Sequence, residues 1–386
     1  MEAIMASAYI TGLGVFLPNA PVSNEEIENV LGLVNGKLSR SKKRILDNNG
    51  IKSRYYAIDP KTGKQTHTNA QLTAEAVRIL SKNSNFPLEQ IKCLVCGTSS
   101  PDQIVPNHTL MVHGELGCPP CEAVATNGVC CSGVTAFKYG YMSVSAGVIK
   151  NAITTASELV SNQFQAKFFQ PEIEAKIQEL QTKPCISFEK DFLRWMLSDA
   201  AAAVLIADTP CQDRISLRID WVDIISFANE VETCMYAGAV KRSDGSLQGL
   251  RDVENPDEVW KENYIALKQD VKLLTANIIP YGKKGFLSVW EKYNLKSDAI
   301  TWFLPHYSSE YFMPQLYETL ENVGFRIPLE KWFTNLTYKG NTGSASIFVM
   351  LEEIMSSGRV KRGDKIFCFV PESARFSYAY MHLTAI

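Results

Sequence analysis

The chain has 386 residues, of which 46% are hydrophobic and 21% are charged. This composition is ordinary for a folded protein with a sizeable core, and it argues against intrinsic disorder. The 39 basic and 41 acidic side chains give a formal net charge of -2, without a Lys/Arg block of the kind that binds nucleic acid or a membrane surface. We therefore expect no nucleic-acid or membrane partner, and the length predicts more than one structural unit.

The opening residues, MEAIMASAYITGLGVFLP, lack the basic region of a secretory signal, and no apolar run reaches the length of a membrane span. We therefore expect a cytoplasmic protein. Because thiols stay reduced in that compartment, the ten cysteines are expected to be free, with roles in packing or in chemistry.

In the first part of the chain, strand-like and helix-like segments alternate. The strand-like AYITGLGVFLP precedes the helix-like QLTAEAVRILSKN, the strand-like IKCLVCGTSS, a helix from Cys131 to Gly147 and the strand-like NAITTASE. SDAAAAVLIADTP, from Ser198 to Pro210, predicts a last strand. This alternation predicts an α/β protein with a substantially parallel sheet.

The second part repeats that order after RISLRIDWVDI. A helix in DVKLLTANIIPYGKKGFLSVWEKY is followed by a strand in DAITWFLPHYSS, a helix from Asn341 to Gly358 and a strand in DKIFCFVPES. We therefore predict two duplicated halves, residues 1–209 and 210–386. Residues 164–190 and 227–260 are less regular, and we interpret them as insertions that shape an entrance.

Cys131 is a candidate nucleophile because NGVCCSGVTAF leads from a strand-like run directly into a helix. Unpaired N–H groups and the dipole at a helix start should lower the thiol pKa and favour the thiolate. Cys130 is interpreted as facing the apolar strand side, whereas the small Ser132 and Gly133 leave room for an acyl group beside Cys131. The alternative is that both cysteines are small buried hydrophobes.

Three further polar residues stand at the ends of predicted elements. His306 follows an apolar strand in WFLPHYSS, at the strand end where α/β sheets place ligand groups. Asn341 opens a helix in GNTGSAS and by itself could simply be its N-cap. Glu158 ends the strand TTASE on the side of Cys131, as a candidate base or, alternatively, a structural carboxylate.

Taken together, ITGLGVFLPN, GIKSR, CCSG, the PH loop and GNTGSAS resemble the β-ketoacyl-acyl-carrier-protein synthase III family across nearly the whole chain. The resemblance implies a thiolase fold, with two βαβαβ-type halves in five layers αβαβα, and usually a homodimer. It maps the family's Cys–His–Asn triad onto Cys131, His306 and Asn341.

The resemblance also implies a reaction in two steps. The Cys131 thiolate takes an acyl group from a thioester, and its backbone N–H contributes to an oxyanion hole. His306 and Asn341, as neutral donors, then hold the thioester oxygen of a second substrate as it becomes an enolate. This describes an acyltransferase of the ketosynthase type, which catalyses a decarboxylative or non-decarboxylative Claisen-type condensation. It needs no cofactor besides phosphopantetheine-linked or coenzyme A thioesters as substrates.

The sequence departs from the family pattern at two places that bear on substrates. Arg44 and Asn48 replace the Trp and Arg that often clamp the adenine of coenzyme A, so acyl carrier protein is favoured as the partner. PESARFSYAY replaces a Gly-rich turn, which makes Arg375 the candidate in the oxyanion loop. Such divergence resembles ketosynthases of specialised polyketide biosynthesis, including cyclases that join two acyl units into cyclohexanediones for dialkylresorcinols or stilbenes.

Two other classes of function remain as alternatives. A plain acyltransferase would pass the acyl group from Cys131 to an alcohol or amine, although retention of Asn341 favours condensation. A non-catalytic acyl-carrier-binding protein would not need the triad.

A zinc site is suggested by the spacing of Cys93-x-x-Cys96 and Cys118-x-x-Cys121. Side chains three apart on a strand cannot easily converge on one ion, so we expect no metal.

Overall fold

The structure is a computed structural model that describes residues 6–39, 41–169 and 192–386. Most of the insertion predicted at 164–190 therefore lies outside the described residues. Nine strands of the described chain form one hydrogen-bonded sheet in the order β13-β14-β15-β8-β1-β7-β6-β4-β5. The sheet is mixed, because both parallel and antiparallel pairs occur in it.

The first half of the chain supplies five neighbouring strands. They are β1 (Tyr9–Phe16), β4 (Cys93–Thr98), β5 (Glu122–Asn127), β6 (Asn151–Glu158) and β7 (Ala200–Ala207). β7 pairs antiparallel with β1 and with β6, whereas β4 runs parallel to β6 and β5.

The second half repeats this arrangement with β8 (Leu217–Ser226), β15 (Ser377–Ala385), β14 (Lys365–Glu372) and β13 (Trp302–Pro305). β15 pairs antiparallel with β8 and β14, and β13 runs parallel to β14. The order β1-β7-β6-β4 thus corresponds to β8-β15-β14-β13, which is the arrangement that two duplicated halves require. The boundary predicted at 209/210 falls in the connection from β7 to β8.

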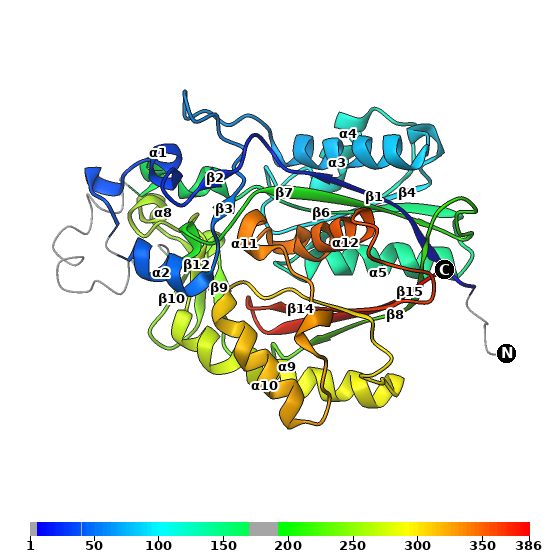
Figure 1. Cartoon of the computed structure of the whole chain (residues 1–386). Coiled ribbons are helices and arrows are strands. Elements are labelled where there is room, and N and C mark those ends of the chain that lie inside the picture. Colours follow the sequence, from blue (N-terminus) through cyan, green and yellow to red (C-terminus); the bar gives the residue numbers. More distant parts are fainter. Residues whose placement is uncertain (1–5, 40, 170–191) are drawn as a thin grey trace.

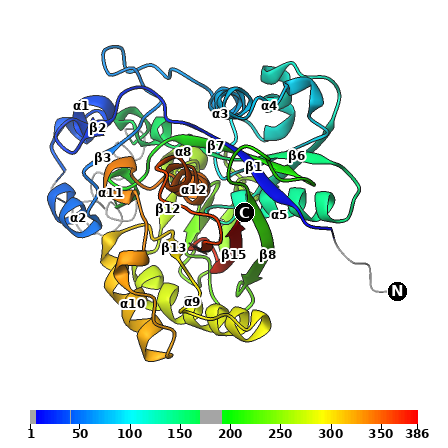
Figure 2. The same ribbon diagram turned by 45° about the vertical axis from the view of Figure 1, so that its right-hand side comes forward.

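Among the described residues, the two sets of strands meet only where β1 pairs with β8, at Tyr9↔Arg218 and Ile10↔Leu217. Beyond that point they diverge and enclose α5 (Ser132–Ser145) and α12 (Ser346–Ser356) (Figure 1). One outer layer holds α3 (Asn69–Ser84) and α4 (His108–Leu116), and the other holds α9 (Val271–Tyr293) and α10 (Met313–Asn322). The same five layers αβαβα are visible after a 45° turn (Figure 2).

The outer helices carry local start signals. Thr68 and Gln71 form a capping box at the start of α3, and the Asp270 carboxylate accepts the N–H of Leu273 at the start of α9. The middle layer is held by packing, because Phe137 of α5 and Phe348 of α12 lie with ring centroids 5.5 Å apart. The buried pair α5 and α12 therefore fixes the two halves against each other.

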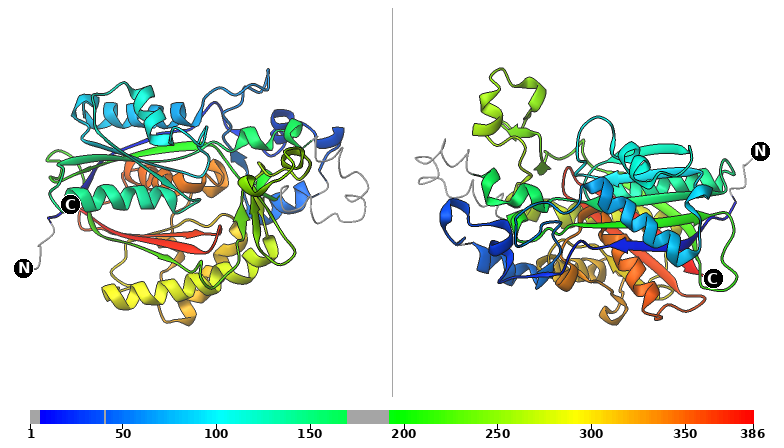
Figure 3. Two further views of the ribbon diagram at one scale, coloured as in Figure 1. Left: turned by 180° about the vertical axis from the view of Figure 1, so that it is seen from behind. Right: turned by 90° about the horizontal axis from the view of Figure 1, so that it is seen from above.

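Short elements gather at one end of the molecule. They are α1 (Ile27–Leu31), α2 (Lys42–Asn49), α11 (Leu336–Lys339), α8 (Asp257–Lys261) and the pairs β2–β3 (Val22–Ser23, Ser53–Arg54), β9–β12 (Met235–Tyr236, Lys268–Gln269) and β10–β11 (Ala239–Lys241, Leu247–Gly249). The hairpin β10–β11 and all but the last residue of α8 lie within the second predicted insertion, and both protrude from that end (Figure 3). Within the described part of the chain, no helix is long and apolar enough to cross a membrane.

Candidate active site

The start of α5 places Cys131 as predicted. Cys131 is the N-cap residue, its side chain caps no backbone group of the helix, and it is only 4% exposed. Gly97 of β4 allows the close approach of this turn, because a Cβ there would lie 2.4 Å from the carbonyl oxygen of Ser132. The helix start is thus pressed against the sheet.

The two neighbouring thiols face different surroundings. The Cys131 Sγ donates to the carbonyl oxygen of Val370 in β14 at 3.4 Å. In the described part of the chain, Cys130 rather than Cys131 lines the apolar cavity that also contains His306 and Asn341 in its wall. This differs from the orientation expected for Cys130, because one residue of rotation at a strand-to-helix turn decides which side chain faces the cavity.

The expected low thiol pKa at this helix start is wrong. Burial raises the pKa of Cys131 well above its usual range, and the nearby Glu372 carboxylate raises it further. The same two causes, in the same order, raise the pKa of Cys130. Both thiols are therefore protonated at neutral pH in this structure, despite the helix dipole.

The carboxylate at this helix start comes from the opposite half of the molecule. Glu372 is the last residue of β14, is 8% exposed, and accepts through Oε2 the N–H groups of Val129 and Cys131 at 3.0 and 2.9 Å. The Cys131 N–H expected in an oxyanion hole is therefore already occupied. Sequence inspection missed Glu372, although the matched segments NAITTASE and KIFCFVPES both place a glutamate at the strand end.

His306 lies where the sequence places it, directly after β13. Its backbone N–H donates to the carbonyl oxygen of Phe369 at 2.8 Å, which fixes it beside the end of β14. Burial lowers the pKa of the imidazole to about 4, so that it is neutral at pH 7. A neutral imidazole can donate one hydrogen bond, as the proposed role in holding an enolate requires.

Asn341 lies further from the start of its helix than the sequence predicts. A 3-10 turn, Gly343–Ala345, follows it, and α12 begins only at Ser346. The Asn341 Oδ1 accepts the N–H of Gly343 at 3.0 Å, and its backbone N–H donates to the carbonyl oxygen of Met196. Because Oδ1 accepts that bond, the amide NH₂ remains as the group that can donate to a ligand.

One mainly apolar cavity contains His306, Asn341, Cys130 and Glu158 in its wall. It continues between the C-terminal strands and the outer helices α9 and α10, where its wall includes Leu274, Ile278, Phe286, Leu316, Leu320 and Phe303. The triad residues predicted from the sequence are thus divided: His306 and Asn341 share this wall, whereas the Cys131 sulfur points to β14.

Glu158 ends β6, as predicted, and is 2% exposed. It accepts the N–H of Ser344 at 3.4 Å, the N–H and hydroxyl of Ser99, and the hydroxyl of Ser100. Burial raises the pKa of this carboxyl, while the serine hydrogen bonds oppose that change. A carboxylate in the cavity wall with a raised pKa fits a base, and its four hydrogen bonds also fit the structural alternative.

Arg375 does not lie at the cavity. Its side chain is exposed and its Nε donates to the carbonyl oxygen of Val231 at 3.1 Å. Ser373 of the same turn lines the cavity, and Glu372, the last residue of β14 before the turn, contacts the start of α5. Arg375 is therefore not among the residues that line the cavity, because the sequence does not show which side of a turn a residue faces.

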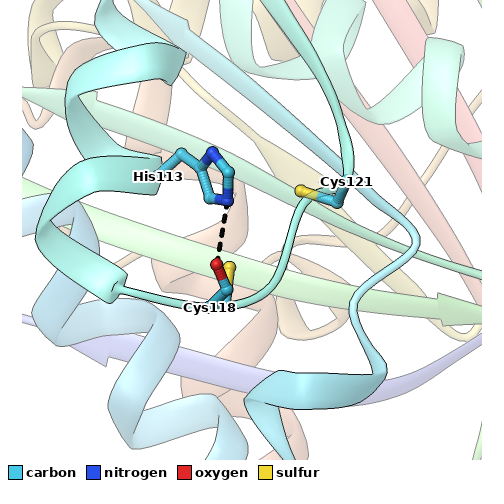
Figure 4. A group of neighbouring side chains, drawn as sticks. All are labelled: His113, Cys118 and Cys121. Atoms are coloured by element: carbon cyan, nitrogen blue, oxygen red, sulfur yellow. Dashed lines mark hydrogen bonds between the residues drawn. The ribbon is translucent and has the colours of Figure 1, made fainter.

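The cysteine pairs lie in two different settings. Cys93 and Cys96 pack into hydrophobic clusters on opposite faces of β4, as strand alternation requires. Ligand atoms of His113, Cys118 and Cys121 lie within 4.8 Å of one another (Figure 4). However, the His113 Nε2 is hydrogen-bonded to the carbonyl oxygens of Cys118 and Pro119, and no fourth ligand of the described residues joins them to complete a structural zinc site.

Comparison with known proteins agrees with this architecture. The family model "3-Oxoacyl-[acyl-carrier-protein (ACP)] synthase III C terminal" matches residues 290–370, which include His306 and Asn341. The β-ketoacyl-[acyl-carrier-protein] synthase III of Clostridium perfringens (strain SM101 / Type A) is 24% identical over 372 residues, 94% of each chain.

Solved structures show the same fold. A variant of OleA from Xanthomonas campestris superposes with a TM-score of 0.77 at 18% identity, covering 100% of both chains. AbyA1, described as a tetronic acid condensing enzyme, gives a TM-score of 0.76 at 17% identity, covering 98% of this chain and 99% of the other. The chain is thus similar in sequence to β-ketoacyl synthase III, and it has the thiolase fold of these solved structures.

Proposed function

We propose that the chain is a ketosynthase that forms a carbon–carbon bond between two acyl thioesters through an acyl-cysteine intermediate. The observation that carries this proposal is one mainly apolar cavity whose wall contains a neutral His306, Asn341 and the thiol of Cys130, the neighbour of Cys131. An apolar wall suits an acyl chain, and two neutral donors suit an enolate oxygen. The likeness to β-ketoacyl synthase III supports the same chemistry.

Cys131 is the proposed acyl acceptor, since the resemblance places the family's nucleophile there and the residue occupies the N-cap position of α5. Its thiol now contacts the Val370 carbonyl, so acylation requires a rotation about χ1 toward the cavity. Cys130, which already lines the cavity, is the competing acceptor. The two cysteines are adjacent in the chain, and substitution of each one in turn shows which of them accepts the acyl group.

The test is mass spectrometry of the peptide that contains both cysteines after incubation with acyl-carrier-protein thioesters. Cys131→Ala should abolish the acyl adduct, whereas Cys130→Ala should retain it. An adduct that persists on Cys130 in the Cys131→Ala protein would transfer the role to Cys130. No adduct in the wild-type protein with any acyl chain would overturn the acyl-enzyme proposal.

The second half-reaction is tested in the same assay. His306→Ala and Asn341→Ala should each keep the acyl adduct but lower the rate of condensation by roughly 10²–10³-fold, because each removes one donor to the developing enolate. Loss of the adduct itself would instead place these residues in acylation.

The finer proposal concerns the second substrate. Decarboxylation of a malonyl group generates a carbanion without a base, whereas a β-ketoacyl thioester must lose an α-proton. Glu158, buried in the cavity wall with a raised pKa, supports the second course and a specialised pathway in which two acyl units are joined and cyclised. Product masses from malonyl and β-ketoacyl carrier-protein thioesters distinguish the two.

Acyl carrier protein is the proposed partner and a homodimer the proposed assembly. Replacing acyl-carrier-protein thioesters by coenzyme A thioesters should slow acylation. Arg44 and Asn48 occupy the positions of the Trp and Arg that often clamp the adenine of coenzyme A, so this clamp is missing. Light scattering after gel filtration measures the assembly.

A further inference from the structure

The carboxylate of Glu372 sits at the start of the helix that carries the proposed nucleophile. Its Oε2 accepts two backbone N–H groups, from Val129 and Cys131, at 3.0 and 2.9 Å. The side chain is buried, and no lysine, arginine or histidine among the described residues forms an ion pair with it. A buried carboxylate held by two N–H groups, without a cation, needs an explanation beyond packing.

The two N–H groups converge on one oxygen atom. Two donors about 3 Å from a common point form the geometry that binds the oxyanion of a tetrahedral intermediate. That point cannot hold the Glu372 carboxylate and a substrate oxyanion together. Thioester attack therefore requires the carboxylate to release these donors.

We propose that Glu372 is the proton acceptor for the acyl-accepting thiol, and that its protonation frees the Val129 and Cys131 N–H groups to bind the thioester oxygen. A neutral carboxyl group accepts hydrogen bonds more weakly than a carboxylate does, so the two events are coupled. This inference rests on the proposed function, because it concerns the acylation half-reaction. It assigns to one residue both formation of the nucleophile and opening of the oxyanion site.

The step balances without any other reactant. The S–H bond breaks and an O–H bond forms on Glu372; the thiolate adds to the thioester carbon, whose oxygen becomes the oxyanion. When the tetrahedral intermediate collapses, the bond from that carbon to the donor sulfur breaks. The departing thiolate takes the proton back from Glu372, and the net change is a thioester exchange.

The surroundings favour Glu372 over His306 as the acceptor. Among the described residues, the Glu372 carboxylate acts on the thiols of Cys130 and Cys131, and Glu158, from the same half as the cysteines, acts on Cys130. The phenol groups of Tyr378 and Tyr380 face Cys131. Burial raises the pKa of Glu372 above that of an ordinary carboxyl, which makes it a stronger base. His306, with a pKa of about 4, is the weaker acceptor.

The decisive variant is Glu372→Gln, whose side-chain oxygen can still accept both N–H groups while the base is lost. Arg375→Ala is the matched control, because Arg375 lies in the same turn but is exposed and points away from the cavity. Circular dichroism and the melting temperature show whether either variant has lost its fold.

Two reagents separate the steps. Iodoacetamide alkylates the thiolate without needing an oxyanion site, and its rate at the peptide holding Cys130 and Cys131 is followed from pH 5 to 9. S-octanoyl-N-acetylcysteamine reports acylation of the same peptide. In the wild type and in Arg375→Ala, both rates should rise as the Glu372 carboxyl ionises.

In Glu372→Gln, acylation should fall at least tenfold at neutral pH and lose the acidic limb of its profile. Alkylation should lose that limb without such a fall, because removing the charge also removes one cause of the raised thiol pKa. An acylation rate equal to or above wild type, or an unchanged acylation profile, would overturn the inference while leaving the condensing function intact. A wild-type protein that is alkylated with this profile but never acylated would instead refute the function and retain the proton acceptor.

Discussion

The two buried helices at the centre of the molecule begin in related but different ways. At the start of α5, Glu372 from β14 accepts the N–H groups of Val129 and Cys131. In the 3-10 turn that leads into α12, Glu158 from β6 accepts the N–H of Ser344. Since β6 corresponds to β14 in the duplication, each half sends the carboxylate at the end of one strand to the helix start of the other half.

The difference lies in how firmly the two carboxylates are held. Glu158 receives two serine hydroxyl bonds in addition to its N–H contacts, whereas Glu372 is held through one oxygen by two N–H groups. Hydroxyl donors stabilise the charged form of a carboxyl, so Glu158 is the more fixed of the two. The duplication thus supplies one carboxylate beside the thiol and one beside Asn341, which suits a reaction with two half-steps.

The strongest way to break this comparison is Glu158→Gln. If Glu158 removes the α-proton of the second substrate, condensation of a β-ketoacyl thioester should slow by roughly 10²–10⁴-fold, as general-base loss typically does. Acylation of the cysteine should remain, since Glu158 is hydrogen-bonded to the turn before α12 and Glu372, not Glu158, accepts the N–H of Cys131. Single-turnover measurement of adduct and product, with malonyl thioester as the base-independent substrate, separates the two.

The opposite result is equally informative. If malonyl and β-ketoacyl substrates slow together, Glu158 supports the position of Ser344 and Asn341 and is only structural. Rates within twofold of wild type for both substrates would remove it from the chemistry.

Much of this architecture follows from the sequence, because helix and strand periodicities are local. The alternation of elements, the duplication, and the placement of His306 and Glu158 at strand ends are all found where predicted. The contact between Glu372 and Cys131 joins residues 241 positions apart, and its geometry depends on how two half-sheets close around α5.

Two errors have the same local origin. The orientation of Cys130 and the position of Arg375 each depend on a turn of a few residues, where a displacement of one residue reverses the side that a side chain faces. Similarly, the 3-10 turn after Asn341 delays the start of α12. Periodic patterns do not encode such turns, although the shared terminal glutamate of the two matched strands was a usable signal.

A smaller effect should appear in stability. Burial raises the folded-state pKa of both Glu158 and Glu372, so each binds a proton more tightly in the folded protein than in the unfolded chain. Each therefore costs stability as pH rises from the ordinary pKa of a glutamate in the unfolded chain through the higher pKa in the folded protein. Both Gln variants should gain melting temperature relative to wild type between pH 5 and 8. A gain that is independent of pH would show that the carboxyl groups are not the cause.

The smallest effect is expected at Arg375. The Arg375 side chain is exposed, and among the described residues its hydrogen bond goes to the backbone carbonyl of Val231. Arg375→Ala should therefore change the rates of acylation and condensation by less than about twofold. Since Glu372 lies three residues earlier in the same turn, this variant asks whether the turn acts through its buried carboxylate or through its exposed cation. A tenfold loss measured in steady-state assays would assign the function to the cation. Such a loss would also weaken the comparison between Glu372 and Glu158, because the residue three positions after Glu158 is Ser161 and not an arginine.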